Sequence, residues 1–190
     1  MGLASLHKHI AKAGKTMTLN IPMPASFPMP PIFPMTGGCQ CGAVRFRAAS
    51  LLDNPHICHC RMCQKATGSF FAALVGVPKT DLSWTRGHAV TFQSSSDVER
   101  GFCRDCGTPL FFHHIPGKHV SISIGSFDTP AAIPLAFELG HADRAPQLDQ
   151  IGQVKQFGTA EEEMPERAAM IAASNRQHPD HDTVMWPAWG

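Results

Sequence analysis

Hydrophobic and polar positions alternate in short runs along the middle of the chain, and these runs predict strands. Val44–Arg47 alternates, and Phe70–Val77 is an apolar run that ends at Pro78. Further strands are predicted at residues 81–85, 89–93, 98–102, 108–114, 118–125 and 135–139. Turns rich in Gly, Pro and Ser separate the runs. Many short strands with frequent turns indicate a mainly β fold.

Helical patterns are fewer and shorter. Cys60–Ala66 predicts one or two helical turns, which Gly68 ends. Thr159 is a candidate N-cap followed by three glutamates, which the helix dipole favours in a first turn, and this helix is expected to run to about Ala173. Another short helix is expected around residues 3–13.

The chain of 190 residues suits one domain with tails. Residues 1–36 are a Pro/Met-rich N-terminal extension, extended and polyproline-like from about residue 21. Residues 37–157 are expected to form the folded domain, long enough to bury a core. Residues 158–190 are expected to form a C-terminal helix and tail.

Charge is unevenly distributed although the formal net charge is only +1. Residues 1–52 contain Lys and Arg but no acid, so all 15 acidic residues follow them. A basic arm could contact nucleic acid or acidic lipid, but so few charges give little phosphate affinity, which favours a solvated tail. No apolar stretch reaches about 20 residues and no apolar region follows Lys8. Neither a membrane span nor a secretory signal is therefore expected.

All seven cysteines gather in three clusters, and this is the strongest chemical signal in the sequence. The clusters are Cys39-x-Cys41, Cys58-x-Cys60-x-x-Cys63 and Cys103-x-x-Cys106. Thiolates are ligands that zinc prefers, and a tetrahedral zinc needs four of them. An odd number of cysteines at these spacings fits metal ligation in a reducing cytosol better than a secreted disulfide framework. A cytoplasmic protein is therefore expected.

The two outer pairs supply four ligands, enough for one closed structural zinc that joins distant parts of the chain. These ligands are Cys39, Cys41, Cys103 and Cys106. If the strand that contains Val44 begins at Cys39, the side chains of Cys39 and Cys41 point to the same face. Spacing alone leaves open the alternative that the two pairs belong to different metals.

The central triplet leaves a second zinc one ligand short. In one interpretation a histidine completes a second structural zinc, and the candidates are His56, His59, His113 and His114. In the other, the fourth position is open to water or a substrate thiol, as in catalytic zinc sites. Ligands so close in sequence cap one side of the metal. This favours the open site and a catalytic role for Cys58, Cys60 and Cys63.

These stretches resemble the glutathione-dependent formaldehyde-activating enzyme family, which includes the centromere protein V type of zinc domain. The matching stretches are Gly38–Val44, Cys58–Gly68, Arg100–Leu110 and, more loosely, Ile124–Asp128, within about residues 36–150. All seven cysteines fall on ligand positions of the family. The resemblance implies a β-tent type fold of folded antiparallel sheets, stapled by zinc. It also implies two Zn²⁺ per chain, divided between the cysteines as above.

The resemblance further implies a carbon–sulfur lyase similar to S-(hydroxymethyl)glutathione synthase, with glutathione or a related thiol and formaldehyde as substrates. Zinc coordination deprotonates a thiol and so makes it a nucleophile. A nearby cation would offset the negative charge of the thiolates, and Arg61, Lys65 and Arg100 are candidates. Family members often carry Trp where this chain has Gln147, in a segment expected to border the pocket.

Two other interpretations belong to different functional classes. One is a non-catalytic zinc-stapled module that binds a protein or nucleic acid through the basic extension. The other is a thiol redox or metal-buffering role for the central triplet. The sequence leaves the oligomeric state and the glutathione-contacting residues open.

Overall fold

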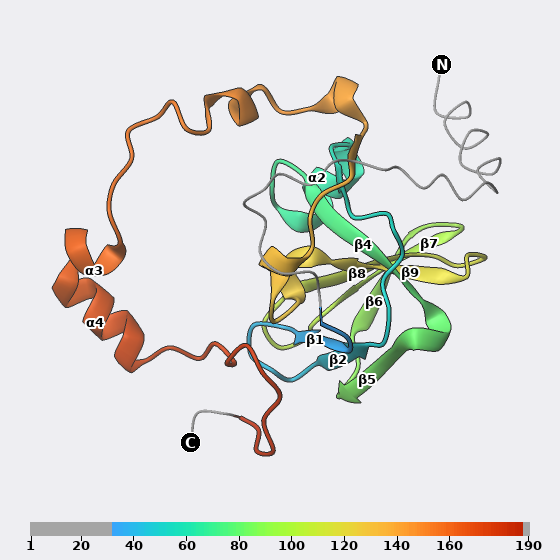
Figure 1. Cartoon of the computed structure of the whole chain (residues 1–190), viewed down its shortest axis with the longest axis horizontal. Coiled ribbons are helices and arrows are strands. Elements are labelled where there is room, and N and C mark those ends of the chain that lie inside the picture. Colours follow the sequence, from blue (N-terminus) through green and yellow to red (C-terminus); the bar gives the residue numbers. More distant parts are fainter. Residues whose placement is uncertain (1–31, 188–190) are drawn as a thin grey trace.

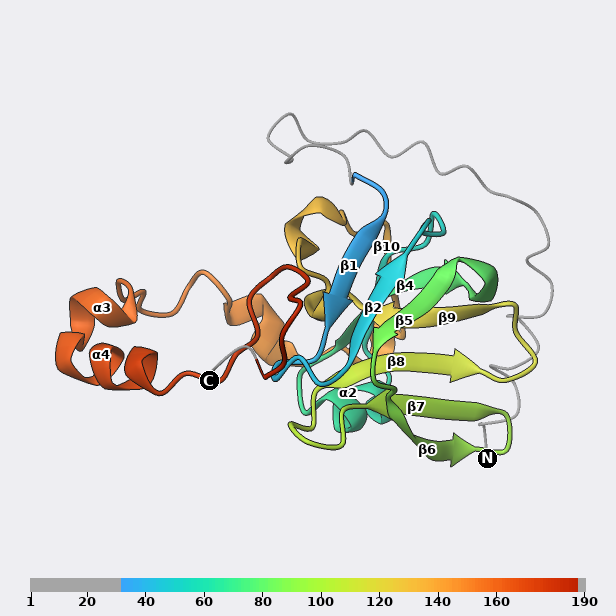
Figure 2. The same cartoon turned by 90° about the horizontal axis from the view of Figure 1, so that it is seen from below.

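The computed structural model describes residues 32–187 and confirms a mainly β fold with few short helices. A three-stranded and a seven-stranded sheet pack together, and two helices of the C-terminal part lie away from both (Figures 1 and 2). The helix predicted around residues 3–13 and most of the proline-rich segment lie outside the described residues. No helix in the described part is long and apolar enough to cross a bilayer.

The smaller sheet has the order β1-β2-β5, with β1 at Met35–Gly38, β2 at Arg45–Ala48 and β5 at Leu82–Arg86. The expectation of a strand beginning at Cys39 is wrong, because residues 39–44 form the turn that joins β1 to β2. The Cys39 amide donates to the Val44 carbonyl (2.9 Å), and the Gly42 amide donates to the Cys39 carbonyl (3.0 Å). A turn therefore sets the direction of the first two thiols.

The larger sheet has the order β10-β3-β4-β9-β8-β7-β6. Its strands are β3 (His56–Cys58), β4 (Ala72–Pro78), β6 (Val90–Ser95), β7 (Val98–Phe102), β8 (Pro109–His114), β9 (His119–Ser123) and β10 (Phe137–Leu139). Neighbours are antiparallel except β10 and β3, which are parallel. The strand predicted to reach residue 125 ends earlier, because a 3-10 turn covers Ile124–Ser126.

The main core lies between the two sheets. Phe46 of β2 is fully buried and makes edge-to-face contacts with Trp84 and Phe127. Fully buried Val75 and Ile122 of the larger sheet belong to the same cluster. Each such aliphatic side chain contributes about 1.5–3 kcal/mol when fully buried, so these contacts hold the small sheet against the large one.

Helix α2 (Arg61–Thr67) follows β3 and carries Cys63 into a small second apolar cluster with Ala72 and Leu74. The helix ends where the sequence predicted, since Gly68 has φ 63° and its amide donates to Gln64. A left-handed residue of this kind favours glycine.

The predicted C-terminal helix is divided into α3 (Ala160–Glu163) and α4 (Pro165–Ala173). Thr159 caps α3 in a reciprocal capping box with Glu162. Proline cannot donate a helical hydrogen bond, so Pro165 ends α3 and begins α4. Beyond α4 the chain returns to the small sheet (Figure 2).

Candidate metal centres

Four cysteines from the two outer pairs meet at one point. Cys39 and Cys41 lie in the β1–β2 turn, and Cys103 and Cys106 lie in the turn that follows β7. All four sulfur atoms lie within 4.8 Å of one another. The sulfur of Cys41 is 3.6 Å from that of Cys39 and 3.8 Å from that of Cys103. The structure therefore places both outer pairs in one cluster. Their spacing in the sequence leaves open whether the two pairs belong to the same metal.

These sulfur separations fit a tetrahedral metal ion. Zinc–sulfur bonds of about 2.3 Å at tetrahedral angles separate the sulfurs by about 3.8 Å, whereas a disulfide needs about 2.0 Å. All seven cysteines are free thiols, and Cys39 and Cys103 are buried. This cluster can hold one metal ion, and it has the closed four-ligand character of a structural site.

The turn around Cys103 is shaped for thiolate ligands. Gly107 has φ 76° and its amide donates to the Cys103 carbonyl (3.0 Å). Burial raises the pKa of Cys103 to about 11, although the amides of Cys106 and Asp105 donate to its sulfur. Burial also acts to raise the pKa of Cys106, but hydrogen bonds with Thr108 lower it to about 6. Donors therefore already point at both sulfurs of this pair.

The central triplet forms a second cluster at the start of α2. Cys58 ends β3, Cys60 is the N-cap residue and Cys63 lies in the helix. Their sulfurs lie within 4.8 Å of one another, with 3.5 Å between Cys58 and Cys60. Hydrogen bonds with Cys58 and Cys63 lower the pKa of Cys60 to about 2, and those with Cys60 and Cys63 raise the pKa of Cys58. The three sulfurs lie close enough together to cap one side of a metal ion.

Within residues 32–187, no histidine joins this triplet. His59 is fully buried, but its Nε2 atom lies 3.4 Å from a carboxylate oxygen of Glu138. That contact is too poorly aligned for a hydrogen bond. His56 stacks on Phe137, and His113 contacts Glu99 at 2.7 Å. Among the described residues, this cluster thus consists of three cysteine sulfurs and no histidine.

Arg100 connects the triplet to a pocket. Its Nη2 atom lies 3.6 Å from the sulfur of Cys63, and its Nε donates to Ser94 Oγ (3.2 Å). The guanidinium also lies 5.1 Å from the ring centre of Phe112. Arg100 is one of the three cations that the sequence offers as candidates, and these contacts distinguish it from Arg61 and Lys65.

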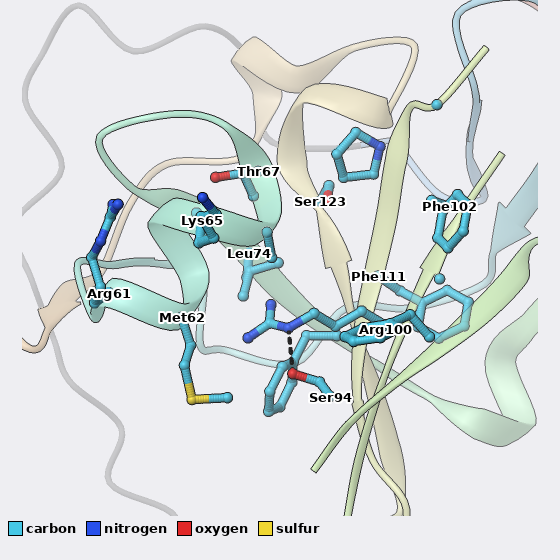
Figure 3. Close-up of a pocket in the computed structure, with 17 residues that line it drawn as sticks. Arg61, Met62, Lys65, Thr67, Leu74, Ser94, Arg100, Phe102, Phe111 and Ser123 are labelled. Carbon is cyan, nitrogen blue, oxygen red and sulfur yellow. Dashed lines mark hydrogen bonds between the residues drawn. The ribbon is translucent and has the colours of Figure 1, made fainter.

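The pocket has a volume of about 650 Å³ and lies between α2 and the face of β6–β9 (Figure 3). Arg61, Lys65 and Arg100 supply its cationic side chains, with Arg61 directed away from Arg100 (Figure 3). The remaining surface is mostly apolar and includes Leu74 and Phe111. The cysteine sulfurs do not line the pocket, so Arg100 and the start of α2 form the boundary between them. A small anionic molecule with an apolar part suits this surface.

Fold and site together define a mainly β protein with two cysteine clusters that can hold metal ions. The sequence model of the glutathione-dependent formaldehyde-activating enzyme matches residues 34–139. The chain belongs to this family.

Three curated relatives are similar to parts of the chain. An uncharacterized lyase of Schizosaccharomyces pombe is 34% identical over 85 residues, which cover 44% of this chain and 60% of the relative. Two proteins provisionally named glutathione-dependent formaldehyde-activating enzymes also match. That of Phaeosphaeria nodorum is 34% identical over 77 residues (38% and 40% coverage), and that of Halomonas elongata is 33% identical over 85 residues (40% and 54%). The chain thus spans between two fifths and three fifths of the relatives it matches.

A crystal structure of a Rhodobacter sphaeroides protein is also similar. It has a TM-score of 0.42 and 24% sequence identity, and the match covers 48% of this chain and 86% of that chain.

Proposed function

We propose that this protein is a zinc-dependent carbon–sulfur lyase-type enzyme that handles the adduct of formaldehyde with glutathione, S-hydroxymethylglutathione, or the adduct with a related thiol. The observation that carries the proposal is the contact of Arg100 with Cys63 at the edge of the pocket. Family membership and the relatives' printed names support the reaction class.

The two cysteine clusters have different roles in this proposal. Cys39, Cys41, Cys103 and Cys106 hold a structural zinc. Cys58, Cys60 and Cys63 hold the second zinc. A zinc held by these three sulfurs would lower the pKa of a substrate thiol and so make its sulfur nucleophilic.

The residues of the pocket orient the substrate and balance its charge. Three thiolates together with a fourth, substrate thiolate exceed the charge of a divalent cation, and the guanidinium of Arg100 offsets part of this excess. Lys65 supplies a further positive charge toward the carboxylates of glutathione. Leu74 and Phe112 remove water from the space beside the sulfur cluster, which strengthens these charge interactions.

The reaction needs no oxidant. The thiol loses its proton, and its sulfur lone pair attacks the carbonyl carbon of formaldehyde to form the carbon–sulfur bond. The carbon–oxygen π pair moves to the oxygen, which takes up a proton to give the hydroxymethyl group. In the lyase direction the hydroxyl proton leaves and the carbonyl reforms, while the carbon–sulfur bonding pair returns to the sulfur, which takes up a proton to give the thiol. In this proposal the guanidinium of Arg100, beside the sulfur of Cys63, offsets the thiolate charge of the site in both directions.

The function is tested by the rate at which formaldehyde exchanges between its hydrate and the glutathione adduct. Because the reaction also proceeds without enzyme, exchange spectroscopy by NMR measures the acceleration by zinc-loaded protein. We expect acceleration by the wild type and none by Cys60→Ser, with the far-UV and near-UV circular dichroism of that variant unchanged.

Two outcomes would contradict the proposal. A wild type that holds two zinc ions without accelerating exchange would favour the non-catalytic binding module, whose salt-dependent binding to nucleic acid can then be measured. If Cys60→Ser unfolds the domain, the triplet is a structural site.

The domain division belongs to the same proposal. Residues 37–157 form the catalytic zinc domain, with an N-terminal extension at 1–36 and a helical tail at 158–190. A reducing compartment such as the cytoplasm suits the free thiols.

A further inference from the structure

The C-terminal segment His178–Trp186, here named the strap, returns to the turn that carries the first two cysteines (Figures 1 and 2). The amide of His178 donates to the carbonyl of Gln40 (2.7 Å), and the indole Nε1 of Trp186 donates to the carbonyl of Cys41 (2.8 Å). Two successive carbonyls of the Cys39–Gly42 turn are therefore held by residues more than one hundred positions away in the sequence.

The side chain of His178 packs directly on Gly42. The residue is only 4% exposed, and a Cβ atom on Gly42 would lie 2.1 Å from its Cδ2 atom. Gly42 therefore allows the imidazole to lie against the backbone of the turn. The ring is fixed in this place because its Nε2 atom lies 3.0 Å from Thr183 Oγ1 and 3.2 Å from Arg86 Nη1.

Two arginines of the small sheet anchor the strap. Arg45, which is 3% exposed, donates to Asp182 Oδ1 from Nε (3.0 Å) and Nη2 (2.8 Å). Arg86 donates to the Thr183 carbonyl and, from Nη1, to the carbonyl of Gly42 (3.1 Å). The strap is thus joined both to the cysteine turn and to the two strands beside it.

We propose that the strap stabilises the four-cysteine centre and slows the release of its metal. His178 and Trp186 act as positioning residues that hold the Cys39–Gly42 turn in its ligand-presenting conformation. The strap lies outside residues 34–139, the part that the family model matches. The inference requires a metal at the four-cysteine cluster and does not depend on catalysis at the triplet.

The physical argument concerns the freedom of a short turn. Residues that orient ligands from outside the coordination sphere typically change metal affinity by 10- to 100-fold. In this turn Gly42 has φ 75°, and glycine has more backbone freedom than any other residue. Bonds to the Gln40 and Cys41 carbonyls restrict that freedom, so a ligand that leaves the metal stays near it and rebinds.

The experiment measures zinc release from the full-length, zinc-loaded protein to an excess of a chromogenic chelator. A Cys60→Ser background isolates the four-cysteine site from the triplet. Trp186→Phe removes the indole donor but keeps an aromatic ring, and His178→Ala removes the imidazole. His181→Ala is the matched control, because His181 lies exposed in the same segment.

We expect release from the four-cysteine site to be about tenfold faster in His178→Ala and several-fold faster in Trp186→Phe. His181→Ala should release zinc at the wild-type rate. When the same strap substitutions are made in the chain with both clusters intact, the rate of zinc release from the triplet should not change. Equal release rates in all variants would overturn the proposal. An equal acceleration of release at both centres would also overturn it, because it would indicate a general loss of stability.

A matched pair of glycine variants tests the contact itself. Gly42 and Gly107 have nearly the same positive φ (75° and 76°) and each follows a cysteine ligand. A Cβ would strike His178 at Gly42, whereas nothing lies within 4 Å of a Cβ at Gly107. Gly42→Ala should therefore accelerate release more than Gly107→Ala does. Equal effects of the two would contradict a role for the strap.

Discussion

The guanidinium of Arg100, on β7, lies 3.6 Å from the sulfur of Cys63, on α2. The contact joins two parts of the chain that are 37 residues apart and places a fixed positive charge between a pocket and a candidate metal ligand. Arginine stays protonated under all ordinary conditions, so this charge is constant.

Removing this charge should lower activity and leave the fold intact. We expect Arg100→Met to reduce kcat/KM for the glutathione adduct by about 10- to 100-fold, because a charged partner of the candidate ligand Cys63 is lost. Arg100→Lys should recover part of the loss, since it keeps the charge but not the planar fork. Arg47→Met, on the exposed side of β2, is the control for loss of a positive charge. An Arg100→Met enzyme with wild-type kcat/KM would remove the main support for the proposed site.

The two cysteine clusters should respond differently to the same substitution. Cys39→Ser should lower the free energy of unfolding by more than about 3 kcal/mol, because apparent zinc binding energies of structural sites reach about 10–16 kcal/mol. Cys60→Ser should change it far less and reduce the zinc content by one ion. Denaturant titration with zinc analysis of each variant measures both quantities. Similar destabilisation by the two substitutions would mean that both clusters are structural.

The ion pair of Arg45 with Asp128 should make stability depend on acid pH. Burial acts to raise the pKa of Asp128, but hydrogen bonds from Arg45 and Thr36 outweigh it, so the pKa is lowered. A lowered carboxyl pKa contributes stability above its unfolded value of about 3.9, and this is lost as the pH falls through the folded pKa.

Asp128→Asn should therefore destabilise the protein by about 3 kcal/mol at pH 7, since Asp128 is only 8% exposed and the pair is buried. The difference from wild type should shrink below about pH 4. Asp182→Asn is the matched control, because Asp182 is half exposed and such pairs contribute about 0–1 kcal/mol. Urea unfolding at both pH values gives the comparison. A difference that does not change with pH would contradict the assignment.

Most strands of the fold can be predicted from hydrophobic periodicity and from the residues that form turns. The alternation around Arg45 and the apolar run before Pro78 correspond to β2 and β4, and Gly68 ends α2 as expected. Strand β3 was not predicted, because its three residues are too few to show a period and two of them flank a ligand cluster. The β1–β2 turn was misjudged because Cys39 and Cys41 fit a strand face as well as a turn.

The cysteines of the candidate site were found from their spacing, but their surroundings were not. Arg100 sits in an ordinary strand, and only the pairing of β7 with β8 places it over Phe112 and near Cys63. The bond from Trp186 to the Cys41 carbonyl joins residues 145 positions apart, and no local pattern marks it. Contacts of this kind depend on tertiary packing and cannot be predicted from local hydrophobic patterns in the sequence.

The segment between Gly140 and His178 is fixed at both ends by the two cysteine clusters. A Cβ on Gly140 would lie 3.2 Å from the amide of Cys60, and His178 lies on Gly42. Helices α3 and α4 therefore belong to a closed loop, although they lie near the end of the sequence. Each doubling of a loop's length costs only about 0.6 kcal/mol, so this loop is a place where a foreign domain can be inserted while both clusters keep their neighbours.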